Sequence, residues 1–65
     1  MNTNYENAIK LIENEIKLNK EIMDFEGAYA MVKFAWIMGI IDRDTRNQYV
    51  DKIDNEIDKA YEGAI

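Results

Sequence analysis

Apolar residues recur every three or four positions through the first third of the chain, a spacing typical of an amphipathic helix. Thr3 followed by Glu6 forms a capping box, in which each side chain satisfies an amide of the first helical turn. The pattern therefore predicts a helix over about residues 3–23. Its apolar stripe consists of Tyr5, Ile9, Ile12, Ile16 and Met23, widened by Leu11, Leu18 and Ile22.

The next segment, GAYAMVKFAWIMGII at residues 27–41, carries one charge, Lys33. It predicts a second helix over 27–38 that Asp24 caps and that ends at Gly39, a residue able to adopt the left-handed conformation. An apolar stripe nevertheless continues across the junction from Leu18 to Trp36. A single continuous helix about 50 Å long is therefore the alternative to two helices.

Beyond Gly39, Ile40 and Ile41 form a turn, and Asp42 is placed to cap a third helix over about 43–62. The stripe of this helix is Tyr49, Val50, Ile53, Ile57, Ala60 and Tyr61. The chain is thus expected to be a single all-α domain, residues 1–65, folded as a small three-helix hairpin or bundle.

The middle helix has apolar side chains in more directions than two neighbouring stripes can cover. We therefore expect a helical homo-oligomer, a dimer or a higher even-numbered state, because large exposed apolar patches usually mark interfaces. The expected interface residues are Ala28, Met31, Phe34, Ala35 and Met38. A membrane span is disfavoured, since residues 25–41 reach only about 25 Å as a helix and would place Lys33 near the bilayer centre.

Thirteen acidic and eight basic residues give a net charge of −5, which disfavours general nucleic-acid binding and favours a basic protein partner. Cysteine and histidine are absent, so neither disulfides nor thiolate metal sites support this small domain. The polar start of the chain lacks the features of a signal peptide, and we expect a cytoplasmic protein.

No combination of residues suggests catalysis. Serine, cysteine and histidine are missing, and Thr3 and Thr45 are both explained as helix-start residues. The segment from Asp42 lacks the glycine and the final glutamate of a calcium-binding EF-hand loop. We therefore expect a protein that is not an enzyme and that needs no metal or cofactor.

Two groups of residues are candidate binding sites. The first is an acidic row at helical spacing, expected to contact a basic partner with Tyr61 at its rim; the alternative is an ordinary solvated face. The row consists of Asp51, Asp54, Asp58 and Glu62. The second is a candidate anion or nucleotide site around the first turn of the third helix, made of Arg43, Arg46, Lys33, Tyr49 and Trp36. Its alternative is a simple ion pair between Asp42 and Arg46.

The stretch AWIMGIIDRDTRNQYVDKI resembles small helical accessory proteins of phages and mobile elements of Gram-positive bacteria. The resemblance implies an accessory or host-manipulating protein, such as a phage-encoded anti-defence factor acting in the host cytoplasm. Our main hypothesis is a non-enzymatic interaction protein that binds and inhibits or regulates another protein. The alternatives are an oligomeric nucleotide-binding sponge and a structural small subunit of a complex.

Overall fold

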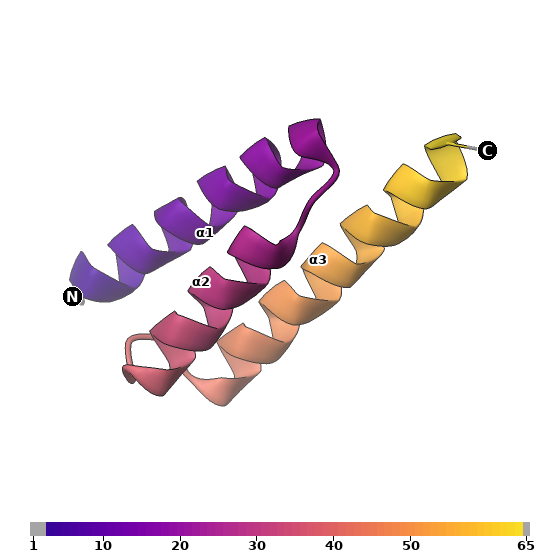
Figure 1. Ribbon diagram of the computed structural model, residues 1–65. Coiled ribbons are helices and arrows are strands. Elements are labelled where there is room, and N and C mark those ends of the chain that lie inside the picture. The colour runs from indigo at the N-terminus through magenta and orange to yellow at the C-terminus, as the bar shows by residue number, and fades with distance from the viewer. Residues whose placement is uncertain (1–2, 65) are drawn as a thin grey trace.

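The computed structural model describes residues 3–64, and Met1, Asn2 and Ile65 lie outside the described residues. It contains helices α1 (Thr3–Ile22), α2 (Glu26–Ile37) and α3 (Arg43–Ala64), and no strand occurs within residues 3–64. Figure 1 shows α2 running back along α1 and α3 running back along α2, so that α1 and α3 point the same way. The prediction of an all-α, three-helix chain is confirmed.

A sharp reversal separates α1 from α2, which decides against one continuous helix. Met23 has a φ of 58°, in the left-handed region, and the Asp24 amide donates to the Asn19 carbonyl oxygen at 3.2 Å. This is the bond that closes a helix in a Schellman motif. Phe25 then turns into the core, whereas Ile22 of the same stripe is exposed. The stripe therefore divides between a buried part and an exposed part at the turn.

The start of α2 is held mainly by a side chain from α1. Asn19 is 3% exposed, and its Oδ1 accepts a hydrogen bond from the Ala28 amide at 2.9 Å. Its Nδ2 donates to Glu15 Oε2 at 2.8 Å. Asp24, the expected cap, accepts from the Glu26 amide instead, and Phe25 occupies the cap position without a side-chain hydrogen bond. The cap of α2 therefore also fastens α2 to α1.

The turn from α2 to α3 follows the prediction. Gly39 has a φ of 73°. Its amide donates to the Trp36 carbonyl oxygen at 3.0 Å, and the Ile40 amide donates to that of Ala35 at 2.9 Å, which together form a Schellman motif. Asp42 Oδ1 then accepts from the Thr45 amide at 2.8 Å and caps α3.

The core lies where α2 meets both neighbours. Its buried apolar residues are Ile12, Ile16, Phe25, Ala28, Val32, Ala35, Ile41 and Ile53. Ala28 is 0% exposed and Ala35 is 7% exposed, so both small residues, expected to contact another copy, pack inside this chain. Small side chains allow helices to approach closely, and here the close approach serves the contacts of α2 with its own neighbours.

Candidate interaction surfaces

Part of α2 remains uncovered by the other two helices. Phe34, Ile37 and Met38 are 69%, 62% and 69% exposed. Beside them a groove of about 370 Å³ runs between α1 and α2 and is lined only by apolar residue types. The lining residues are Ala8, Leu11, Ile12, Ala30, Met31, Phe34, Ala35, Met38 and Ile40. We call Leu11, Met31, Phe34, Ile37 and Met38 the open apolar face.

The total surface of the chain is large for its mass. A monomeric protein of 7.6 kDa is expected to expose about 4,300 Å². This chain exposes 4868 Å². The excess of roughly 600 Å² approaches the area of about 800 Å² that each partner buries in a standard protein interface. Of the five residues predicted for an oligomer interface, Met31, Phe34 and Met38 belong to the open apolar face, which also includes Leu11 and Ile37.

The acidic row lies along the exposed side of α3. Asp51, Asp54, Asp58 and Glu62 are all exposed, and the Asp54 carboxylate accepts a hydrogen bond from the Tyr29 hydroxyl. That bond raises the pKa of Tyr29 to about 12, with burial adding to the effect. Within residues 3–64, the other three carboxylates make no hydrogen bond and no ion pair. Tyr61, the predicted rim residue, is exposed as well.

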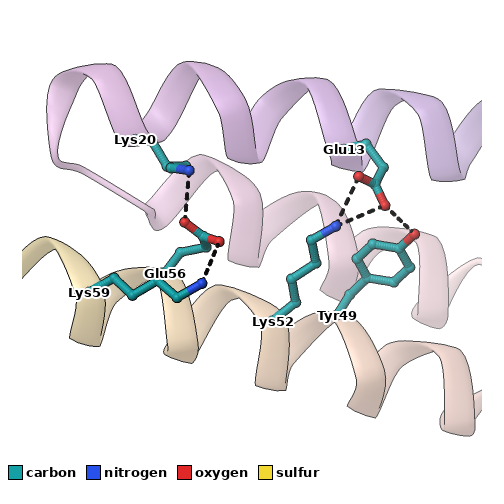
Figure 2. A network of polar contacts seen from close by, with 6 residues as sticks. All are labelled: Glu13, Lys20, Tyr49, Lys52, Glu56 and Lys59. Carbon is teal, nitrogen blue, oxygen red and sulfur yellow. Dashed lines mark hydrogen bonds and ion pairs between the residues drawn. The ribbon is translucent and has the colours of Figure 1, made fainter.

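The lysines that neighbour the acidic row in sequence are engaged elsewhere. Figure 2 shows Lys52 reaching across to α1, where its Nζ lies 3.0 Å from Glu13 Oε2. Lys59 turns to Glu56, with 3.9 Å between Nζ and Oε1, and Glu56 also binds Lys20 of α1 at 2.9 Å. Among residues 3–64, therefore, no basic side chain is bonded to the acidic row.

The same contacts join α1 to α3 and shift several pKa values. The Tyr49 hydroxyl donates to Glu13 Oε1 at 2.7 Å. This bond, together with Lys52, lowers the pKa of Glu13, while burial and the Glu13 carboxylate raise the pKa of Tyr49 to about 12. The hydrogen bond from Lys20 lowers the pKa of Glu56. Tyr49 is therefore committed to the α1–α3 contact and lies away from the proposed anion site.

Three of the five candidate anion-site residues do meet. Lys33, Trp36 and Arg46 line one pocket of about 240 Å³ between α2 and α3, whereas Tyr49 and Arg43 are not among its lining residues. The Arg46 guanidinium carbon lies 4.4 Å from the centre of the Trp36 ring. Within the described part of the chain Arg46 makes no ion pair, so the alternative of an Asp42–Arg46 pair is wrong. Asp42 instead accepts hydrogen bonds from Thr45, which lower the pKa of its carboxyl.

No helix within residues 3–64 combines the length and the apolar character needed to cross a membrane. No three or more side chains of the metal-binding types gather there in a way that could hold a metal ion.

Comparison of the chain with protein-family models, curated proteins and solved structures finds no match.

Proposed function

We propose that this chain is a non-enzymatic interaction protein that binds a basic protein surface through the acidic row of α3 and pairs with a second copy through its open apolar face. The observation that carries the proposal is that, within residues 3–64, no basic side chain pairs with Asp51, Asp58 or Glu62, although lysines neighbour them in sequence. Such carboxylates can bind a basic surface without first breaking an ion pair within their own chain.

Binding of this kind leads to inhibition or regulation by competition. A basic surface on a protein commonly receives phosphate groups or acidic segments. A helix that places several carboxylates along one edge occupies the same surface and excludes those ligands. This reading requires no reaction chemistry from the chain.

Self-association is supported by the open apolar face. An exposed patch containing Phe34, Ile37 and Met38 is energetically unfavourable in water, and burying it contributes about 25 cal/mol for each Å². A second copy is the occupant we propose, because the same uncharged patch on two chains forms an isologous interface. A dimer also presents two acidic rows, which strengthens binding to a partner with two basic sites.

The acidic row is tested with a helical peptide that carries lysines at four-residue intervals, its binding followed by fluorescence anisotropy. The triple variant Asp51→Asn, Asp58→Asn, Glu62→Gln should bind about tenfold more weakly, as expected for the loss of several exposed charge pairs. The matched control Glu6→Gln, Glu21→Gln, Asp44→Asn removes the same charge from exposed positions elsewhere. Equal losses in both variants would show that only net charge matters and would refute the row as the binding site.

Self-association is tested by sedimentation equilibrium. The wild-type chain should sediment with the mass of a dimer, and Phe34→Gln should shift it toward a single copy. Ile22→Gln is the control, because Ile22 is equally exposed at 69% but lies outside the open apolar face. A wild-type chain that keeps the mass of one copy at high concentration would refute the pairing.

A further inference from the structure

The pocket between α2 and α3 combines carbon surface with two cationic side chains. Its lining residues are Tyr29, Val32, Lys33, Trp36, Arg46 and Val50. The valines and the two aromatic rings supply apolar walls, while Lys33 and Arg46 supply positive charge. This composition differs from that of both surfaces discussed above, one wholly apolar and one acidic.

The Arg46 side chain makes a ring contact but no hydrogen bond to residues 3–64. Its guanidinium carbon lies over the Trp36 ring, a cation–π contact that restrains the group. Its Nε is buried and donates to no acceptor within the described residues, which is uncommon for a buried polar atom in a folded protein. No carboxylate among residues 3–64 pairs with Arg46, although Asp42 precedes it by one helical turn.

Lys33 adds a second charge at the same pocket. It is exposed and makes no hydrogen bond or ion pair with any part of the chain that the structure describes. Tyr29, which also lines the pocket, donates its hydroxyl to the Asp54 carboxylate. Two cations on one apolar pocket therefore lack a bonded counter-charge from the described residues.

We infer that this pocket binds a small organic oxyanion with a flat apolar body, such as an aromatic carboxylate or an aromatic phosphate ester. The planar guanidinium suits carboxylate and phosphate oxygens alike. The apolar walls favour an organic ligand over a bare inorganic ion. At about 240 Å³ the pocket is smaller than the 300–1,000 Å³ typical of drug-sized ligands, so it fits a single ring better than a nucleotide.

The test uses the single tryptophan of the chain as a local reporter. Titration of the isotope-labelled wild-type protein with benzoate and with phenyl phosphate should move the Trp36 indole N–H signal in a saturable way. Benzamide, the neutral analogue of benzoate, should bind at least about tenfold more weakly, since it lacks the charge that Lys33 and Arg46 recognise. The two anions together distinguish a carboxylate site from a phosphate site, and inorganic phosphate and a nucleoside monophosphate test whether the apolar body and the size matter.

Variants separate a site from a general charge effect. Lys33→Gln changes an exposed side chain and should weaken benzoate or phenyl phosphate binding about threefold to tenfold without disturbing the fold. Arg46→Gln should weaken it further, and Arg43→Gln, which removes a cation from the same helical turn outside the pocket, should leave it unchanged. The inference is overturned if neither anion binds saturably, if benzamide binds as well as benzoate, or if Arg43→Gln and Lys33→Gln have equal effects. Each of these results is independent of peptide binding and of self-association.

Discussion

Met23 ends α1 in a left-handed conformation, with a φ of 58°. This conformation costs a residue with a side chain about 1–2 kcal/mol, and glycine adopts it without that penalty. At the other end of α2 the equivalent position is Gly39. Both turns therefore need a left-handed residue after the helix, and one uses methionine where the other uses glycine. The first turn is the strained one.

Met23→Gly should therefore stabilise the fold by about 0.5–1 kcal/mol, the relief of strain being partly offset by the greater freedom of glycine in the unfolded chain. Chemical denaturation measures the change in the free energy of unfolding. Glu21→Gly, within α1, should instead destabilise the fold, because glycine there loses freedom without relieving strain. Destabilisation by both variants would contradict the role given to Met23.

Asn19 is the second residue on which the junction depends. Asn19→Ala should lower the free energy of unfolding by about 1–3 kcal/mol, because the Ala28 amide is buried with it and would lose its acceptor. The control is Asn14→Ala, an exposed asparagine of the same helix, which should change stability by less than about 0.5 kcal/mol. Similar effects at both positions would show that Asn19 is not a cap.

Local signals in the sequence explain which parts of the fold could be predicted. Helical spacing, Gly39 and Asp42 act within a few residues of themselves, and the structure has the helices and the α2–α3 turn where those signals place them. Asn19 could not be recognised as the cap of α2, because its bond depends on the path of the chain after the turn. Neither could Met23, since methionine carries no turn preference.

The candidate sites, too, were predictable where local sequence decides them and unpredictable where they depend on how the helices pack. The exposure of Phe34 and Met38 could be predicted, because the apolar side chains of α2 point in more directions than two neighbouring helices can cover. The burial of Ala28 and Ala35 did not, because spacing alone does not tell which neighbour a small residue faces. The direction taken by Lys52, away from the acidic row and toward Glu13, required knowing that α1 lies beside α3.

At the scale of elements, the polar contacts that join α3 to α1 and to α2 make stability depend on pH. Glu13 and Glu56 have pKa values below their ordinary 4.5, so their stabilisation is present above pH 4.5 and is lost as the pH falls through the lowered values. Tyr29 and Tyr49 have pKa values raised from 10 to about 12. The stabilisation that these two tyrosines contribute is therefore complete below pH 10 and is lost as the pH rises through 12. With no histidine, side-chain titration leaves stability nearly constant between these limits.

Glu13→Gln should reduce the dependence of the free energy of unfolding on pH at both the acidic and the alkaline end. It removes a carboxylate with a lowered pKa, and it lowers the pKa of Tyr49 toward 10 because part of the shift comes from Glu13. Unfolding measured across pH reports the first effect, and tyrosinate absorbance reports the second. Asp54→Asn is the comparison variant and should lower the pKa of Tyr29 alone. An unchanged tyrosine titration in Glu13→Gln would contradict the observed Glu13–Tyr49 contact.

At the scale of the whole molecule, the two proposed surfaces should respond to salt in opposite directions. Copies that each carry a charge of −5 repel one another, so salt should strengthen pairing through the open apolar face. Attraction between the acidic row and a basic peptide should weaken in the same solutions. Sedimentation equilibrium and peptide anisotropy at low and high salt measure the two effects. Weakening of both by salt would contradict an apolar pairing surface.

The turn between α1 and α2 also bears on how two molecules can be built from this sequence. The apolar stripe runs through residues 23–25, so a chain that lost the turn would have a single long helix there instead of a loose linker. Its amino-terminal half could no longer reach its own α2 and would have to pack on that of a second molecule. The Met23 turn therefore separates a self-contained fold from a domain-swapped dimer.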